Sequence, residues 1–184
     1  MFLGQRVRLR PVEREDIPRF IKWLADAETR AHLGKRLPVG HAQEEKWFEG
    51  NATKGDLQVW AIDAQPEALG PWTHIGSCGF HEIHTHSRVG EVGILIGAHE
   101  YWGKGYGSDA METLVAMGFG MLNLNRIQLR VFDDNPRAIR SYEKVGFTVE
   151  GRLRQENFYN GAYRDTFIMS ILRADWEART ARQD

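Results

Sequence analysis

The chain has 184 residues, of which 42% are hydrophobic and 27% charged, values that are ordinary for a globular protein with one buried core. Its formal net charge of −1 gives no overall attraction to nucleic acid or to an anionic membrane. The single cysteine, Cys78, excludes an internal disulfide framework and fits a reducing compartment. No apolar stretch resembles a secretion signal or approaches the roughly 20 residues of a membrane span. We therefore expect one cytoplasmic domain over residues 1–184.

The first half of the chain is predicted to contain two helices and three strands. Apolar residues spaced i, i+3, i+4, i+7 share one helix face, and this spacing occurs at Ile17, Phe20, Ile21 and Leu24. A second, less regular helix is expected over residues 42–48. Alternating or strongly apolar sequence predicts three strands, over residues 7–10, 57–62 and 74–80.

The middle of the chain predicts a strand, a helix and a second strand. The strands are Val89–Ile96 and Arg126–Phe132, and the helix covers residues 107–122, after a polar loop. Next, Asn135 can cap a helix because its side-chain oxygen accepts a bond from a free backbone N–H, and Pro136 at the first helical position loses no bond.

Gly146 ends this helix, and two final strands are expected over residues 147–152 and 163–172, joined through a turn at residues 160–161. There is no internal repeat and no linker-like stretch. Together the elements indicate an α+β fold in which helices cover both faces of one sheet.

Three glycines, Gly103, Gly105 and Gly107, lie between the Val89–Ile96 strand and the following helix. Glycine allows positive φ and a close approach of the backbone to a ligand, and the first N–H groups of a helix favour an anion. The loop is therefore predicted to cradle a pyrophosphate, with Lys104 as an added positive charge. A flexible connection is the alternative interpretation.

The same residues also fit a dinucleotide-binding fingerprint, since Gly105-x-Gly107-x-x-Ala110 matches G-x-G-x-x-A and Asp133 or Asp134 follows the next strand. In that motif the turn comes immediately after the strand, whereas a polar stretch over residues 98–104 intervenes here. The chain after residue 134 also lacks the further strand–helix repeats of a doubly wound sheet. NAD binding is thus a minor alternative.

Two segments resemble the GNAT superfamily of N-acetyltransferases. Residues 94–110 resemble its cofactor motif Arg/Gln-x-x-Gly-x-Gly/Ala, with Gly105 and Gly107 at the glycine positions and Trp102 at the Arg/Gln position. Residues 135–147 match the motif Asn-x-x-Ala-x-x-x-Tyr-x-x-x-Gly-Phe. Residues 9–16 and 157–165 resemble the branch that contains RimJ/RimL-type ribosomal-protein N-terminal acetyltransferases and spermidine acetyltransferases.

The resemblance implies a three-layer α+β fold and acetyl-CoA as cosubstrate, without a metal. The central sheet would be mixed, mostly antiparallel, with about seven strands, and splayed at the acetyl-CoA site. Pantetheine would insert as a pseudo-strand, whereas the apolar side chains of the strand alone indicate only burial. The implied cofactor-binding residues are Ile94, Leu95, Ile96, Trp102, Gly103, Lys104, Gly105, Tyr106, Gly107, Ser108, Asn135 and Tyr142.

Tyr142 occupies the family position of the general acid that protonates the departing thiolate. Its alternative role is packing, because it shares a helix face with Ala138, Ile139 and Val145. Glu91 is the predicted general base for the amine, with Glu82 and Glu156 as substitutes. The histidines His81, His84 and His86 do not have a known metal-ligand spacing, and a polar or substrate-facing edge is favoured for them.

The acceptor is predicted to be an amine, most simply the N-terminal α-amine of a protein or peptide. The stretch over residues 31–37 contains Lys35 and Arg36, whereas spermidine enzymes of this branch carry acids there, so a polyamine would meet like charges. A small amine such as a polyamine or an aminoglycoside-like compound is the alternative. A catalytically silent acetyl-CoA sensor is another, and a homodimer is one option for the oligomeric state.

Overall fold

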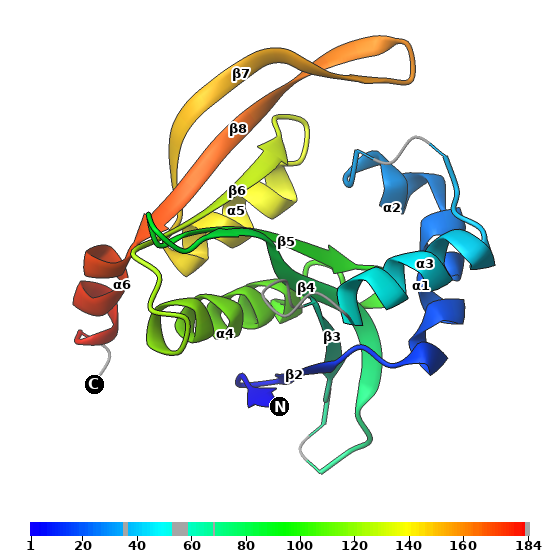
Figure 1. Cartoon of the computed structure of the whole chain (residues 1–184), viewed down its shortest axis with the longest axis horizontal. Coiled ribbons are helices and arrows are strands. Elements are labelled where there is room, and N and C mark those ends of the chain that lie inside the picture. Colours follow the sequence, from blue (N-terminus) through cyan, green and yellow to red (C-terminus); the bar gives the residue numbers. More distant parts are fainter. Residues whose placement is uncertain (35–36, 53–58, 68, 183–184) are drawn as a thin grey trace.

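The computed structural model describes residues 1–34, 37–52, 59–67 and 69–182, and its centre is a sheet of eight strands (Figure 1). The strand order is β1-β2-β3-β4-β5-β6-β8-β7, and every neighbouring pair is antiparallel except β5 and β6, which are parallel. The strands are β1 (Phe2–Leu3), β2 (Val7–Pro11), β3 (Val59–Ala64), β4 (Thr73–His84), β5 (Val89–Ile96), β6 (Arg126–Phe132), β7 (Thr148–Tyr159) and β8 (Ala162–Leu172).

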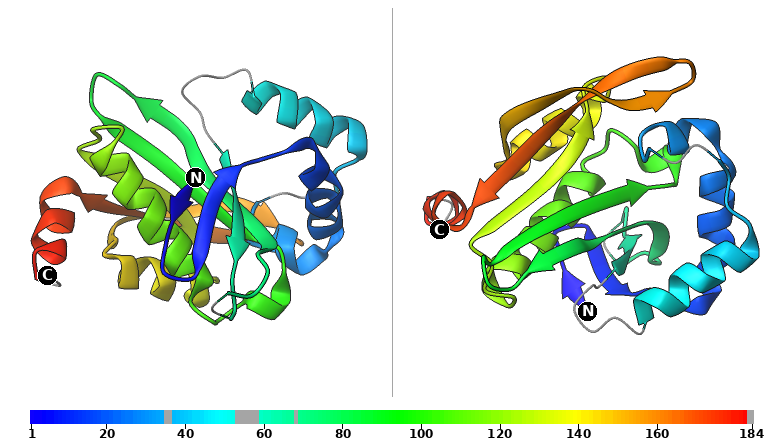
Figure 2. Two further views of the ribbon diagram at one scale, coloured as in Figure 1. Left: turned by 90° about the horizontal axis from the view of Figure 1, so that it is seen from below. Right: turned by 45° about the horizontal axis from the view of Figure 1, so that its top comes forward.

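Helices flank the sheet on both sides (Figure 2). The α-helices are α1 (Ile17–Ala25), α2 (Ala27–Ala31), α3 (His41–Ala52), α4 (Tyr106–Gly120), α5 (Pro136–Val145) and α6 (Arg173–Thr180), and short 3-10 turns are η1 (Arg14–Asp16) and η2 (His99–Tyr101). Helix α4 packs against β2, β4 and β5, and α1 packs against α3. None of the described helices is long and apolar enough to cross a membrane.

Helix α4 contributes many of its side chains to the buried core. Its side chains Met111, Leu114 and Val115 are fully buried against the sheet. A Cβ added to Gly118 would lie 2.7 Å from Ile127 and 2.8 Å from Phe80, so the helix approaches the sheet more closely than any larger residue would allow. This packing fixes the start of α4 relative to β5, and therefore fixes the glycine loop between them.

Strands β5 and β6 separate after a short paired stretch. Only Val89, Gly90 and Glu91 of β5 pair with β6, through Arg126, Ile127 and Gln128. Beyond these pairs both strands continue, β5 to Ile96 and β6 to Phe132, and they diverge in Figure 1. Residues 92–96 therefore have a backbone edge that no β6 partner occupies, which confirms the splay that the resemblance implied.

The fold class predicted from the sequence is confirmed, and β5 and β6 have the predicted bounds. The sheet has eight strands rather than about seven, because the two-residue β1 is too short to carry a pattern. Strands β4 and β7 extend to His84 and Tyr159, beyond the predicted residues 80 and 152, since their outer parts are polar and lack the alternation of a half-buried strand.

Helices α2 and α6 were missed by the sequence analysis. Helix α2 has only five residues and is set by its N-cap, where the Asp26 carboxylate accepts a bond from the Thr29 backbone N–H at 2.7 Å. Helix α6 has no buried residue and so carries no clear apolar stripe.

The predicted strand over 57–62 is β3, although residues 57–58 lie outside the described part of the chain.

Candidate active site

A cleft of about 740 Å³ opens where β5 and β6 diverge. Its walls come from both strands, the loop before α4, helix α5, the end of α2 and parts of the β7–β8 hairpin. The predicted site residues that line it are Glu91, Ile94, Leu95, Ile96, Trp102, Gly103, Gly105, Gly107, Ser108, Asn135 and Tyr142. Two predicted residues, Lys104 and Tyr106, are not among its lining residues.

The glycine loop has the conformation that its sequence suggested. Gly103 and Gly105 have φ of +70° and +90°, in the left-handed region that favours glycine, and a Cβ at either position would meet no atom within 4 Å. Gly105 is the N-cap residue of α4, so the free N–H groups of the first helical turn follow directly. The loop therefore offers an open, positively polarised surface to an anion such as pyrophosphate.

Trp102 ties this loop to the end of β5. Its indole N–H donates to the carbonyl of Ile96 at 2.6 Å. The guanidinium carbon of Arg137 lies 3.7 Å from the centre of the indole, and the ring of His99 stacks at 3.8 Å. The tryptophan thus holds an arginine at the mouth of the cleft, in place of the Arg/Gln side chain that the family motif usually has at this position.

Tyr106 and Lys104 support the loop from behind. Tyr106 is only 3% exposed, packs edge-on against Tyr101 at 5.3 Å, and lies 4.2 Å from the guanidinium carbon of Arg6. The Lys104 carbonyl accepts a bond from Arg6 at 3.1 Å. These contacts anchor the loop to the N-terminal segment, and neither Lys104 nor Tyr106 is among the residues that line the cleft.

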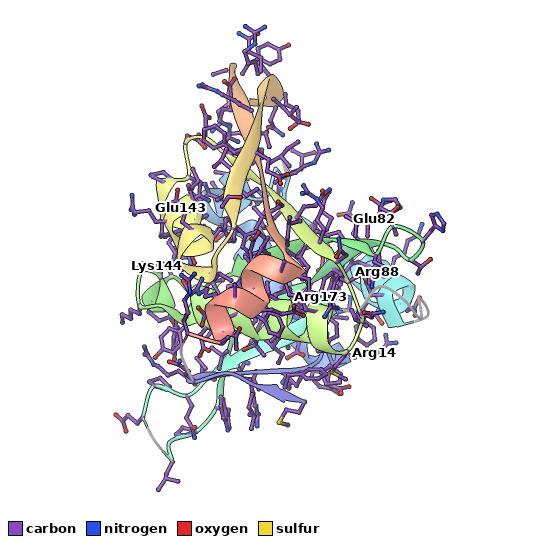
Figure 3. All side chains as sticks on the ribbon, turned by 90° about the vertical axis from the view of Figure 1, so that its left-hand side faces the viewer. Arg14, Glu82, Arg88, Glu143, Lys144 and Arg173 are labelled. Atoms are coloured by element: carbon purple, nitrogen blue, oxygen red, sulfur yellow. The ribbon has the colours of Figure 1, made fainter. Side chains whose placement is uncertain are left out.

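Three cations of α5 line the cleft, and the sequence analysis missed them. Arg137, Arg140 and Lys144 are spaced i, i+3, i+7, which places them on one helix face, and Figure 3 labels Lys144 on α5. The i, i+3, i+7 spacing is visible in the sequence, and these residues could have been predicted from it. They provide the local positive charge for a phosphate-rich ligand that the net charge of the chain does not reveal.

Asn135 caps α5 at the cleft, and Ser108 links α4 to α5 there. The Asn135 side chain accepts the backbone N–H of Ala138 at 3.1 Å, as the capping prediction required. The hydroxyl groups of Ser108 and Ser141 are 2.8 Å apart, which links the first turn of α4 to α5. Both residues also line the cleft, so each could contact a ligand with its remaining polar capacity.

Tyr142 lines the cleft from α5 and is 9% exposed. Its ring packs edge-on against Phe147 at 6.0 Å. Burial raises the pKa of the Tyr142 phenol to about 12, because the phenolate would lose its hydration. The phenol is therefore neutral throughout the physiological pH range and available as a donor.

At the other end of the cleft, two carboxylates share one arginine. Glu91 is held by the Gln128 amide at 3.1 Å and has Arg130 3.9 Å away, while Glu156 pairs with Arg130 at 2.6 Å. Glu91, Arg130 and Glu156 all line the cleft, and we call them the acceptor cluster. The cluster brings together two of the three carboxylates named from the sequence.

The third carboxylate, Glu82, lies elsewhere. Its side chain is 62% exposed, it contacts His84 at 3.2 Å, and Figure 3 shows it on the side of the molecule away from α5. His81 lines the cleft, whereas His84 and His86 do not. Within the described ranges, no group of three His, Cys, Asp or Glu side chains could hold a metal ion.

The end of α2 bridges the mouth of the cleft. Thr29 bonds His99 at 2.8 Å on one side, and on the other Arg164 of β8 donates to the Ala31 carbonyl at 3.0 Å. Between these contacts His32 lines the cleft, and burial lowers its pKa. Lys35 and Arg36, on which the substrate prediction was based, lie outside the described residues.

Comparison with known proteins agrees with this geometry. The acetyltransferase (GNAT) domain family matches residues 6–148. The chain is 34% identical over 177 residues to the spermidine N(1)-acetyltransferase of Escherichia coli (strain K12), covering 94% of this chain and 89% of that protein. It is 28% identical over 180 residues to an uncharacterized N-acetyltransferase, p20, of Bacillus licheniformis, covering 94% and 96%.

Among solved structures, a spermidine N-acetyltransferase from Vibrio cholerae in complex with CoA and spermine matches with a TM-score of 0.85 and 26% identity, over 95% of this chain and 99% of that one. The chain therefore belongs to the GNAT acetyltransferase family. It is an N-acetyltransferase that uses acetyl-CoA as its acetyl donor and an amine as its acceptor.

Proposed function

We propose that this enzyme transfers the acetyl group to the N-terminal α-amine of a protein or peptide. The observation that carries the proposal is the acceptor cluster. Its two carboxylates, Glu91 and Glu156, flank the single cation Arg130, so the cluster carries one net negative charge. One ammonium group balances that charge, whereas the three charges of spermidine would not be balanced there.

Amine chemistry favours the same acceptor. The attacking amine must be neutral, and an α-amine with a pKa of about 7.7–8.0 is neutral in roughly a tenth of molecules at pH 7. A lysine-type amine with a pKa of about 10.4 is neutral in roughly one molecule in 2,500. A site that carries only one net negative charge and does little to shift the pKa of the bound amine can therefore use an α-amine more readily than an alkyl amine.

The cleft residues have separate tasks in the proposed reaction. The loop from Trp102 to Ser108 and the α5 cations bind the phosphates, and the free edge of residues 92–96 bonds the pantetheine amides. A backbone N–H on that edge stabilises the oxyanion as the amine nitrogen attacks the thioester carbon. Tyr142 then donates toward the sulfur as the C–S bond breaks.

A small amine is the second candidate acceptor, because proteins named spermidine N-acetyltransferase match nearly the whole chain. Those relatives support a polyamine, while two features oppose it: Lys35 and Arg36 in the sequence, and the acceptor cluster, which has only one net negative charge for the three positive charges of spermidine. The two candidate acceptors differ in charge, so the preference of the enzyme for one over the other should weaken as salt is added.

The test is an acceptor panel followed as CoA thiol release, with the acetylated atom located by mass spectrometry. We expect a peptide with a free N-terminus to exceed spermidine in kcat/KM, with a preference that shrinks as salt is added. The same peptide with a blocked N-terminus and a free lysine is the matched control and should be a poor acceptor. A kcat/KM for spermidine at or above that of every peptide would overturn the proposal.

A further inference from the structure

A bulge interrupts β7 shortly before the β7–β8 turn. The register of β7 against β8 shifts between Leu153 and Asn157. Residues 154–156 of β7 lie there opposite a single residue of β8, Asp165. A bulge of this kind breaks the alternation of a strand and re-aims its side chains.

The side chains of Glu156 and Asn157 show the effect of this bulge. They are consecutive in the chain, yet both line the cleft. Counted from Leu153, which lies opposite the cleft-lining Thr166, regular alternation would turn Glu156 to the other face. With the bulge in place, Glu156 instead reaches Arg130 of β6 at 2.6 Å and completes the acceptor cluster.

The carboxylate of Asp165 holds the bulge. One oxygen accepts the backbone N–H of Gln155 at 2.7 Å, and the other accepts the Nε–H of Arg152. Gln155 has φ of +55°, a left-handed conformation that a residue with a side chain keeps only where its surroundings enforce it. The bonds from the Gln155 N–H and the Arg152 guanidinium hold the pKa of Asp165 below its ordinary value, so the carboxylate is charged at neutral pH.

The backbone of Asp165 also connects the bulge to β6. Its carbonyl accepts the N–H of Asp133 at 3.1 Å, directly after β6 ends at Phe132. Arg130 lies on β6, and its partner Glu156 lies in the bulge. One residue thus joins the two segments that supply this ion pair.

The position of Glu156 sets the charge of the acceptor cluster. Arg130 is 2.6 Å from Glu156 and 3.9 Å from Glu91. If Glu156 were turned away, Glu91 alone would balance Arg130, and the cluster would have no net charge in place of one negative charge. An ammonium group would then be attracted less strongly.

We propose that Asp165 is a positioning residue for the acceptor amine, which acts by holding the β7 bulge that brings Glu156 to Arg130. Asp165 is not among the residues that line the cleft, so its effect on the amine passes through Glu156. The proposal rests on the role of the acceptor cluster in the proposed function, but not on which amine that cluster holds.

A double-mutant cycle of Asp165→Ala and Glu156→Gln tests this proposal, with whichever amine is the best acceptor in the panel. We expect each single variant to raise the KM for the amine by about 10-fold, the effect of one partly exposed charge near the amine, while the Kd for acetyl-CoA stays unchanged. Because Asp165 acts through Glu156, the double variant should have the same KM as Glu156→Gln alone.

Two substitutions separate the bulge from the ion pair with Arg152. Asp165→Asn keeps an oxygen for the Gln155 N–H and should restore most of the affinity for the amine. Asp133→Ala is the matched control, because Asp133 also binds Arg152, at 3.4 Å, whereas the Gln155 N–H is bonded to Asp165. Its KM for the amine should be that of the unmodified enzyme.

Deletion of the bulge gives an independent test that does not depend on the folding of Asp165→Ala. A chain that lacks Arg154 and Gln155 would pair Glu156 with Asp165 in a regular register and turn Glu156 away from the cleft. Its KM for the amine should match that of Glu156→Gln. An unchanged KM in Asp165→Ala, in Glu156→Gln or in the deletion variant, or additive effects in the double variant, would overturn the proposal. A preference for spermidine in the panel would overturn only the choice of acceptor.

Discussion

Replacing Tyr142 with phenylalanine is expected to lower kcat by roughly 10²–10⁴-fold while acetyl-CoA affinity changes little. The substitution removes one hydroxyl that lines the cleft on α5 and leaves the ring that packs on Phe147. Without that donor, the thiolate must leave unassisted. Steady-state kinetics and calorimetric titration with acetyl-CoA measure the two quantities separately.

The raised pKa of Tyr142 restricts how this acid works. A phenol with a pKa of about 12 would protonate a free thiolate, whose thiol pKa is about 8.5, at a cost of about 5 kcal/mol. The phenol therefore acts by hydrogen bonding while the C–S bond breaks, rather than by completing the transfer beforehand. Because the neutral phenol is the working form and its pKa is raised, Tyr142 should cause no loss of kcat between about pH 7 and 10.5.

A second tyrosine variant controls for loss of a hydroxyl group in general. Tyr163→Phe changes a residue that is exposed on β8, and its kcat should stay unchanged. If Tyr142→Phe turned over at a near-normal rate but had a lower melting temperature, the residue would serve packing with Ala138, Ile139 and Val145 instead.

Replacing Gly105 with alanine is expected to weaken acetyl-CoA binding by about 10–100-fold, the equivalent of one lost charge-assisted hydrogen bond. A Cβ at this position meets no protein atom within 4 Å and instead enters the space in front of the first turn of α4. In the proposed binding mode a phosphate of acetyl-CoA lies in this space, so the added methyl group would displace it. Calorimetric titration with acetyl-CoA measures the change.

Backbone strain must be separated from this effect, since Gly105 has φ of +90°. Gly161 offers a matched control because its φ is +83°, its Cβ would also meet nothing within 4 Å, and it lies in the turn of the β7–β8 hairpin. Both variants should lose about 1 kcal/mol of stability. Only Gly105→Ala should lose affinity for acetyl-CoA. An equal Kd for acetyl-CoA in both variants would show that the glycine loop is not part of the binding site.

Some of the site could be read from local sequence because it depends on local chemistry. The Asn135 cap, the glycines with positive φ and the bounds of β5 each follow from one residue type or one pattern. The splay between β5 and β6 did not follow from residues alone, since an apolar strand looks the same with or without a neighbour. It came from the family resemblance.

Other features depend on contacts between distant segments and could not be predicted. The bulge in β7 is visible only in the register between β7 and β8. The inward position of Tyr106 depends on Arg6 and Tyr101, and the bridge by α2 depends on His99 and on Arg164, which is 133 residues from its partner Ala31. By contrast, the cationic face of α5 was readable from its spacing and was overlooked.

Hydrogen exchange of β5 with and without acetyl-CoA tests most directly whether the cleft between β5 and β6 is the donor site. The amides of residues 92–96 that face β6 have no strand partner there, so a bound pantetheine should slow their exchange strongly. The amides of the β7–β8 turn at residues 160–161 should exchange at the same rate in both states. Unchanged exchange over residues 92–96 at saturating acetyl-CoA, with protection appearing elsewhere, would contradict a donor site between β5 and β6.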